Sequence, residues 1–368
     1  MASPNRLQHY GWDASPYSAK TRAYLRFKGI PHDDVHPTAR RLYGEIQKAV
    51  GRMVMPTVRL PDGTWLQDSS EIIDALEAAH PSPSIAPPGP RQRLASLLLE
   101  VHGDEWLPIV IMHTRWNVPE NAAFARTEFA REGLPWLPGF LGRALVAPIW
   151  KRMAGYRGIL GIQDSTIPGI EAFGRELIAR LDAHLAQHAF LLGGRPCLGD
   201  FALFGPLWAH MWRDPGTRHW FDAAPAVVAW MERLQAPPVS GDFLPDDDVP
   251  ESLDAVFQTL FAEHWVHLTD LKAKIDGWCE ANPGATRVPR SLGDTPFLIG
   301  GASGTRRLLT SAWWMVQRPL DAYDAFDAAG RAAADGWLRR VGGYEGLQLP
   351  RSHRFVRRGF KIVLEQPA

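Results

Sequence analysis

The sequence contains little cysteine. Its two cysteines among 368 residues, Cys197 and Cys279, lie in different segments and lack the spacing of a metal site. Disulfide frameworks and structural zinc sites both need several cysteines at characteristic spacings. The pair therefore indicates neither, supplies no cysteine nucleophile motif, and fits a reducing compartment.

Long hydrophobic runs and net charge are also absent. No stretch of about 18 apolar residues occurs, and the N-terminus has no continuous apolar segment of the signal-peptide kind. Lys plus Arg and Asp plus Glu both total 40, so the formal net charge is zero. A neutral chain gives no electrostatic reason to expect nucleic acid or an anionic membrane. We therefore expect a cytoplasmic protein with no membrane or nucleic-acid partner.

Proline, by contrast, is frequent and divides the chain. The prolines at 81, 83, 87, 88 and 90 exclude a helix or a central strand, so the stretch 81–92 predicts an interdomain linker. Pro237-Pro238 and the acidic run 246–248 predict a second linker. The expected domains are therefore 1–80, 93–236 and 237–368, and a hydrophobic content of 45% can fill their cores.

The first 80 residues begin with a predicted strand and helix. Leu7 to Trp12 can form a short strand, and Ser15-Pro16 supplies a hydroxyl N-cap followed by proline at the first helical position. Gly29 has the place of a helix-ending glycine. Backbone N–H groups and the helix dipole favour an anion beside Ser15, such as a thiolate. The alternative is that Ser15 only caps the helix.

Two further motifs follow. Residues 54–60 predict a strand with Pro56 near its start, a position found at edges, bulges or cis turns. Residues 61–64 have the composition of a tight hairpin turn before a return strand. Asp68-Ser69 then opens a second helix, which it can cap. The same pair can instead hold the ammonium and carboxylate groups of a small ligand.

In this order and spacing, Ser15-Pro16-Tyr17-Ser18, Met55-Pro56 and Asp68-Ser69 resemble the N-terminal domain of cytosolic glutathione S-transferases with a serine-type active-site turn. The resemblance covers residues 6 to about 236. It implies an α+β protein with a thioredoxin-like domain of order βαβαββα and an all-α domain, here followed by an additional mixed α/β extension of unknown role. It also implies a detoxifying homodimer that uses glutathione as co-substrate and no metal.

The resemblance assigns roles in the first domain. Ser15 would donate a hydrogen bond to the glutathione sulfur and favour the thiolate, which attacks a hydrophobic electrophile. The backbone of Met55, before a cis Pro56, would pair with the cysteinyl part of glutathione. Asp68 and Ser69 would bind the γ-glutamyl end.

Three more residues belong to the expected site. Arg52 is the best substitute for the lysine that binds the glycyl carboxylate in several classes, with the arginines at 40 and 41 behind it. Tyr17 would contact glutathione, and Tyr10, at the end of the first strand, would line the substrate pocket. Either tyrosine is an alternative to Ser15 as the group that activates the thiol.

The chemistry stays partly open. Serine at both 15 and 18 argues against a dithiol or mixed-disulfide mechanism. Conjugation, reductive dehalogenation, isomerisation and aryl-ether cleavage all remain, because the fold does not select among them. A non-catalytic ligand-binding or interaction protein is the alternative, motivated by the extension and by the weakened glycyl-carboxylate site.

The second domain should begin with a long helix from Arg91 to Trp116, kinked near Pro108. The resemblance places this helix beside the electrophile, so Trp106, His113 and Trp116 are pocket candidates. Ordinary core packing is the alternative.

Two later segments of this domain are also informative. Prolines interrupt residues 117–166, which predicts an irregular, aromatic-rich insertion that roofs the pocket, forms an interface or fills a satellite core. Asp200, three residues after Cys197, predicts a helix capping box in which sulfur replaces the usual hydroxyl. Asp200 is therefore expected to determine the fold rather than to act in catalysis.

The extension shows no catalytic constellation. Its pattern predicts one long amphipathic helix from Leu253 to Cys279, a hairpin of 296–301 with 307–316, a mostly helical stretch 318–341 and a terminal strand 355–364. Its basic residues are spread out and indicate a solvated face: Arg306, Arg307, Arg339, Arg340, Arg357 and Arg358.

Overall fold

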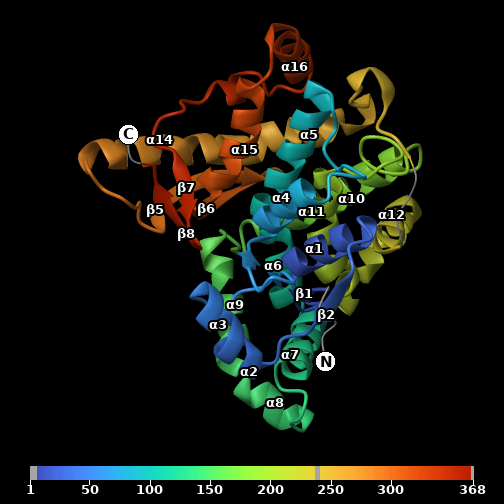
Figure 1. Cartoon of the computed structure of the whole chain (residues 1–368), viewed down its shortest axis with the longest axis vertical. Helices are drawn as coiled ribbons and strands as arrows, with labels where there is room; N and C mark the ends of the chain where they lie inside the picture. The colour runs from blue at the N-terminus through green and yellow to red at the C-terminus, as the bar shows by residue number, and fades with distance from the viewer. Residues whose placement is uncertain (1–5, 237–240, 366–368) are drawn as a thin grey trace.

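The first domain is built on a four-stranded sheet of order β2-β1-β3-β4 in a computed structural model that describes residues 6–236 and 241–365 (Figure 1). The predicted linker residues Pro237 and Pro238 lie outside the described residues. Strand β1 runs parallel to β2 and antiparallel to β3, and β3 pairs with β4. The strands are β1 (Leu7–Tyr10), β2 (His32–Val35), β3 (Thr57–Arg59) and β4 (Trp65–Gln67).

The helices of this domain complete the predicted βαβαββα order, which is confirmed. Pro16 opens α1, and Gly29 follows the helix with a φ of 62°, a left-handed conformation that glycine adopts without strain. The elements are α1 (Pro16–Phe27), α2 (Ala39–Arg41), the π-helical η1 (Leu42–Ile46), α3 (Gln47–Val50) and α4 (Ser69–Ala79).

The helical domain begins with the predicted kinked helix. Pro108 lacks a backbone N–H and stands at the first position of α6, just after a π-helical segment, so the break falls where it was expected. The domain contains α5 (Pro90–Val101), η2 (His102–Trp106), α6 (Pro108–Asn117), α10 (Ile167–Leu185), α11 (Leu198–Pro206), η3 (Leu207–Trp212), η4 (Pro215–Phe221) and α12 (Pro225–Gln235).

The capping box at α11 is confirmed. Asp200 Oδ2 accepts a hydrogen bond from the Cys197 N–H at 2.8 Å. Its Oδ1 accepts from the Leu191 N–H at 3.0 Å and from the Trp230 indole at 2.8 Å. Burial raises the pKa of Asp200 to about 6, although these donors oppose the rise. Asp200 therefore organises the core of the domain.

The insertion is not irregular, so that prediction is wrong. It forms α7 (Pro119–Gly133), α8 (Gly139–Leu145) and α9 (Ala147–Ile159). The prolines that suggested interruption stand in first turns: Pro119 opens α7, and Pro148 lies in the first turn of α9. Because proline is tolerated where the N–H needs no partner, these residues start helices instead of breaking them.

The extension begins with the short η5 (Pro245–Asp247). A continuous helical stretch then follows, as predicted, made of η6 (Glu251–Leu253), α13 (Asp254–Thr259), η7 (Leu260–Trp265) and α14 (Val266–Ala281). A hairpin of β5 (Ser291–Ile299) and β6 (Ala302–Leu309) follows. Its turn is Gly300-Gly301, both at positive φ, so the second strand starts earlier than predicted and the sequence from 312 is helical.

The C-terminal part of the extension contains two helices and a second hairpin. The helices are α15 (Ala312–Asp324) and α16 (Ala328–Arg340), followed by η8 (Glu345–Gln348). The predicted terminal strand is instead β7 (Phe355–Arg358) paired with β8 (Lys361–Leu364). Gly359, at a φ of 60°, allows the tight reversal that a strand prediction could not anticipate.

The extension packs along the rest of the molecule. Helices α15 and α16 contact α5, and the extension lies beside α4 and α5 in Figure 1. A buried ion network joins three parts of the chain: Glu100 of α5 accepts from Lys20 of α1 at 2.8 Å and from Arg318 of α15 at 2.9 Å. Arg318 also pairs with Asp74 of α4. Among the described residues, no helix is both long and apolar enough to cross a bilayer.

Candidate functional site

The predicted glutathione motifs meet at one end of the sheet. Tyr10 of β1 pairs with Thr57 of β3, and Thr57 pairs with Gln67 of β4. The loop that leads to Ser15, the turn at Met55-Pro56 and the start of α4 at Asp68 therefore leave the sheet at the same edge. The register brings together motifs as far apart in sequence as Ser15 and Asp68, which are 53 residues apart.

Ser15 is the N-cap of α1. Its Oγ accepts a hydrogen bond from the Ser18 N–H at 3.2 Å, and the residue is partly exposed. A hydroxyl that accepts one bond keeps its own O–H for donation. Ser15 therefore has a free donor at the positive end of a 12-residue helix, where an anion is stabilised.

The other two motifs have the backbone geometry that a tight site requires. The Met55-Pro56 peptide bond is cis. Asp68 has a φ of 84°, an uncommon value for a residue other than glycine, and caps α4 because its Oδ1 accepts from the Ser70 N–H at 3.1 Å. Ser69, in the first turn of α4, is buried.

The C-terminal hairpin contacts this site directly. Arg357 of β7 donates to Asp68 Oδ2 at 2.6 Å, and its Nε lies 3.0 Å from Glu71 Oε1. The guanidinium also stacks 4.5 Å from the centre of the Trp314 ring. Arg52 donates to the Phe360 carbonyl at 2.5 Å. The extension therefore already engages the side chains expected to bind the two ends of glutathione.

Acidic groups surround the inner side of the turn. The Tyr17 hydroxyl donates to the Asp104 carbonyl at 2.9 Å, and Lys20 pairs with the Asp104 carboxylate at 2.6 Å. Burial raises the pKa of Asp104 to about 6, and burial together with Asp104 raises that of Glu105 to about 8. Burial also raises the pKa of Glu71 to about 6. Burial therefore favours the protonated form of these carboxyl groups near the start of α1 and α4.

Tyr10 does not reach the turn with its hydroxyl. The ring is buried and stacks on Trp65, with centroids 5.3 Å apart. Its hydroxyl donates to Glu45 at 2.6 Å and lies 2.8 Å from Gln8 Oε1. Burial and the Glu45 carboxylate raise the pKa of Tyr10. The phenol therefore remains protonated and is bound to its neighbours, which leaves Ser15 the better-placed donor.

The three pocket candidates of the kinked helix are buried and packed. Trp106 stacks on His264, with centroids 4.8 Å apart, and lies 5.0 Å from the Arg306 guanidinium of the extension. His113 hydrogen-bonds Glu171 at 3.1 Å. Trp116 stacks on Trp150 of α9 at 6.3 Å. The insertion and the extension thus cover the surface on which the resemblance places the electrophile.

Sequence reasoning missed Arg357 and Arg306. The sequence pattern places both on a solvated face, yet the Arg357 side chain is 10% exposed and Arg306 is 5% exposed. Burial lowers the pKa of Arg306 to about 10. Alternation along β6 was the available signal for Arg306, which shares a face with Leu308. No local signal pointed to Arg357, because its carboxylate partner lies 289 residues away.

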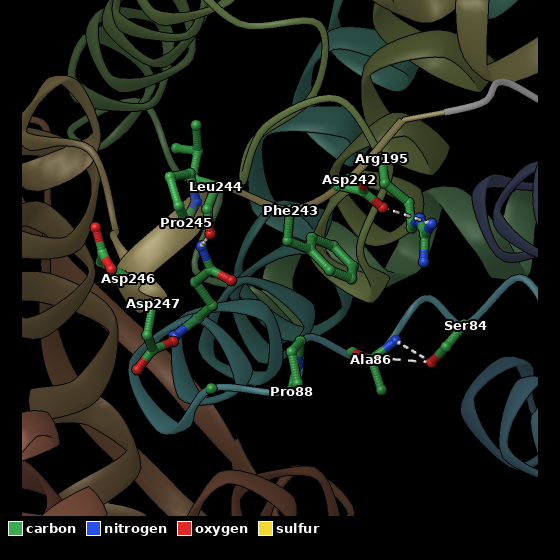
Figure 2. Close-up of a pocket in the computed structure, with 12 residues that line it drawn as sticks. Ser84, Ala86, Pro88, Arg195, Asp242, Phe243, Leu244, Pro245, Asp246 and Asp247 are labelled. Atoms are coloured by element: carbon green, nitrogen blue, oxygen red, sulfur yellow. Dashed lines mark hydrogen bonds and ion pairs between the residues drawn. The ribbon is translucent and has the colours of Figure 1, made fainter.

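A surface cavity of about 540 Å³ lies elsewhere, where the two linkers meet (Figure 2). The stretch from Ser84 to Gln92 forms one wall, and Arg195 with residues 242–247 forms the other. In Figure 2 the Arg195 guanidinium reaches Asp242 across the top of the cavity, beside the Phe243 ring. None of the predicted site residues lines it.

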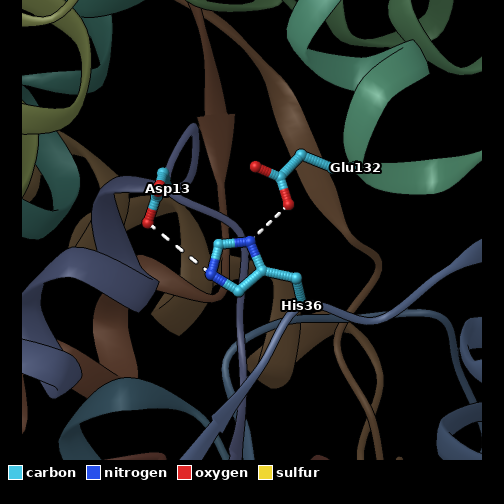
Figure 3. A group of neighbouring side chains, drawn as sticks. All are labelled: Asp13, His36 and Glu132. Carbon is cyan, nitrogen blue, oxygen red and sulfur yellow. Dashed lines mark hydrogen bonds and ion pairs between the residues drawn. The ribbon is translucent and has the colours of Figure 1, made fainter. Parts of the chain in front are cut away.

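Asp13, His36 and Glu132 form a compact polar group next to the turn (Figure 3). The imidazole stands between the carboxylates, with Nδ1 bonded to Glu132 and Nε2 3.9 Å from Asp13 Oδ1. Arg22 lies 3.1 Å from Asp13, and Arg131 lies 3.0 Å from Glu132. The three residue types can ligate a metal, but alternating charges already account for the arrangement.

Two protein-family models match the chain. The model described as glutathione S-transferase, N-terminal domain, matches residues 10–84. The model described as glutathione S-transferase, C-terminal domain, matches residues 174–233. The first match contains the turn, the cis proline and the start of α4, and the second contains the capping box.

Solved structures similar to the chain include two transferases and an etherase. The β-etherase LigF from Sphingobium is 20% identical, with a TM-score of 0.43, over 63% of this chain and 96% of its own. A glutathione S-transferase from Methylobacterium radiotolerans, in complex with glutathione sulfonate, is 21% identical, with a TM-score of 0.39, over 63% and 92%. The transferase GSTFuA3 from Phanerochaete chrysosporium is 17% identical, with a TM-score of 0.43, over 63% and 97%. None of the curated proteins matches the chain.

Proposed function

Because the chain belongs to the glutathione S-transferase family, we propose that it is a glutathione-dependent transferase acting on a hydrophobic electrophile. In this proposal Ser15 hydrogen-bonds the glutathione sulfur, the Met55 backbone pairs with the cysteinyl part, and Asp68 and Ser69 bind the γ-glutamyl end. The thiolate then attacks a carbon of the electrophile, so that an S–C bond forms and the leaving group departs with the electron pair of the bond that breaks.

The observation that supports this proposal most is the convergence of the three motifs at one sheet edge. Ser15 offers a free hydroxyl donor at the N-terminus of α1. The Met55-Pro56 peptide bond is cis, and Asp68 caps α4. A thiolate at this place gains a hydrogen bond and the favourable field of a helix N-terminus, and both lower its pKa towards neutrality.

A non-catalytic ligand-binding protein is the second candidate, and the hairpin contacts favour it. Asp68 already holds Arg357, and Arg52 already donates to Phe360. A glutathione ammonium must share or replace the first contact, and a glycyl carboxylate must compete for the second. Binding of glutathione therefore competes with contacts inside the chain.

Calorimetric titration with glutathione distinguishes the candidates at the level of binding. Heat of binding at glutathione concentrations up to millimolar supports the enzyme and is required by it. No detectable binding would exclude a glutathione transferase. Binding without turnover of chloronitroaromatic, haloalkane or aryl-ether substrates would favour the ligand-binding protein.

Substitution of Ser15 tests the catalytic role. Ser15→Ala removes both the hydroxyl and the cap, whereas Ser15→Asp keeps a cap acceptor but has no hydroxyl. We expect both variants to lose about 2–3 kcal/mol of transition-state stabilisation. Their pH–rate profiles should move to higher pH, because the pKa of the glutathione thiol rises. Ser84→Ala, in the linker, is the matched control. Unchanged turnover in both Ser15 variants would remove Ser15 from the mechanism.

A further inference from the structure

The insertion exposes large apolar side chains at one end of the molecule. Trp136 is 59% exposed, Phe140 67% and Leu145 62%. Leu141 and Met153 are exposed as well. Scattered exposed apolar residues are ordinary, but these belong to α8, the loop before it and the helix after it. We call this set, with the basic residues named below, the α8–α9 surface.

The packing of α8 explains why this face is open. Gly142 faces α7, where a side chain in its place would lie 3.2 Å from Ala130, and Val146 is buried on the same side. Phe140, Leu141 and Leu145 lie on other faces of the helix and are exposed. Gly142 is the buried residue of α8, and the large apolar side chains of this helix are exposed to solvent.

The charge of this segment differs from that of the whole chain. No aspartate or glutamate occurs between Glu132 and Asp164, although the chain has 40 acidic and 40 basic residues. The same stretch contains four basic residues, of which Arg143, Lys151 and Arg152 are exposed. A neutral average therefore conceals a local surface that is both basic and apolar.

Helix α8 lies at one end of the longest axis of the molecule, away from the extension (Figure 1). The α8–α9 surface is therefore at the end of the molecule opposite the extension. The exposed apolar and basic residues alternate along the loop before α8, α8 itself and the start of α9. A surface that combines both kinds suits an interface where apolar side chains enter and cations remain at the boundary.

A second copy of the chain fits the α8–α9 surface less well than an anionic bilayer does. Self-association through this surface would bring Arg143, Lys151 and Arg152 of two copies together without an acidic residue of the segment to neutralise them. An anionic bilayer satisfies both properties, because its headgroups attract the cations and its acyl region receives Trp136, Phe140 and Leu145.

We propose that the α8–α9 surface docks this protein onto anionic lipid membranes as a peripheral protein. Docking requires no spanning helix. It places the tip of the insertion in the headgroup region and leaves the first domain and the rest of the helical domain in water. The proposal does not depend on glutathione binding.

Vesicle co-sedimentation of the full chain tests the proposal. We compare vesicles of phosphatidylcholine alone with vesicles that also contain phosphatidylglycerol. Three exposed cations predict binding to the anionic vesicles on the order of a hundredfold tighter, weakening as salt is added. Equal binding to both vesicles, or no binding to either, would overturn the proposal.

Paired variants separate the apolar and basic contributions. Phe140→Ser/Leu145→Ser should weaken binding by more than about tenfold, since two side chains no longer enter the bilayer. Lys151→Gln/Arg152→Gln should weaken it by about thirtyfold. The matched controls are Val266→Ser/Leu298→Ser and Arg287→Gln/Arg290→Gln, which remove exposed residues of the same kinds from the extension. Controls that weaken binding as much would contradict the assignment.

Sedimentation velocity tests the rival occupant. The proposal expects wild type and Phe140→Ser/Leu145→Ser to sediment identically in the absence of vesicles. A concentration-dependent dimer that this double variant abolishes, without vesicle binding by wild type, would show that a second copy occupies the surface. All the substituted side chains are exposed, so thermal melting of the variants should match that of wild type.

Discussion

The extension and the α8–α9 surface both depart from the two-domain framework, yet they use the same residue types in opposite ways. In the extension, large side chains such as Phe257 and Trp313 are fully buried. In the insertion, Phe140 and Trp136 are mostly exposed. Hydrophobic residues of similar size therefore serve internal packing in one region and remain available for an external contact in the other.

The basic residues repeat the contrast. Arg318 and Arg357 of the extension reach carboxylates of α4 and α5, and these ion pairs fasten it to both domains. Arg143 and Lys151 of the insertion stand in a segment that contains no acidic residue. Basic side chains of the same kind thus bind carboxylates within the chain in one region and remain available to a partner in the other.

The largest difference should appear when one phenylalanine is truncated in each region. Phe257 packs edge-on against Trp337, with centroids 5.0 Å apart, and is fully buried. Phe257→Ala should lower the free energy of unfolding by about 3–5 kcal/mol, since it leaves a cavity. Phe140→Ala should change it by less than about 0.5 kcal/mol. Urea unfolding measures both, and a large loss in Phe140→Ala would show that α8 packs more than the structure indicates.

The second prediction concerns the ion network that holds the extension to the core. Arg318→Met leaves the buried Glu100 with Lys20 as its charged partner and the Ser70 hydroxyl as a neutral donor, and should cost about 3 kcal/mol. Burial raises the pKa of Glu100, but Arg318 and Lys20 together lower it to about 2. A lowered carboxylate pKa stabilises the fold above the unfolded value near 4.5, and this stabilisation disappears as the pH falls towards 2.

The control for this prediction is a surface pair of the same chemistry. Arg307 pairs with Asp294 at 2.9 Å, and both side chains are about half exposed. Arg307→Met should have little effect at any pH, because exposed pairs contribute little. Urea midpoints measured at neutral and acidic pH compare the two. Equal losses in the two variants would contradict the role of Arg318 as a fastening residue.

Much of this fold was predictable because its signals are local. The Ser15-Pro16 start, the Pro56 position and the Asp200 box each depend on residues within a few positions, and the structure has all three. The prediction of an irregular insertion was wrong for a local reason too. Proline excludes the middle of a helix but suits its first turn, and sequence alone did not show which place Pro119 takes.

For the candidate site, the sequence predicted the residues of the first domain but not the contacts that the extension makes with them. Ser15, Met55 and Asp68 could be expected to converge, because strand pairing sets where their loops leave the sheet. The contact of Arg357 with Asp68 joins residues 289 apart and depends on how the extension packs. Its strand, β7, was part of the predicted terminal strand, but no periodicity indicates which distant carboxylate an arginine meets.

The third prediction tests whether the extension restrains the site it contacts. Arg357→Ala frees the Asp68 carboxylate for the ammonium of glutathione, so affinity should rise by about tenfold, or about 1.4 kcal/mol. Arg358→Ala is the control, since it removes the same charge from the next, exposed position. Isothermal titration measures both. Weaker glutathione binding in Arg357→Ala would mean that Arg357 belongs to the ligand site rather than competing with it.

The smallest effect is expected at the connection between the insertion and the first domain. His36, after β2, bonds Glu132 at the end of α7, and this bond raises the pKa of His36. A raised folded pKa stabilises the protein fully below the unfolded value of about 6.5, and the contribution is lost as the pH rises through the folded value. His36→Asn should therefore destabilise most below pH 6.5 and progressively less in alkaline buffer, when urea midpoints are compared with those of the exposed control His219→Asn. A difference that does not change with pH would show that His36 acts by packing. The expected decline would show that the insertion is joined to the first domain partly by a titratable contact, whereas the arginines of the extension stay charged throughout.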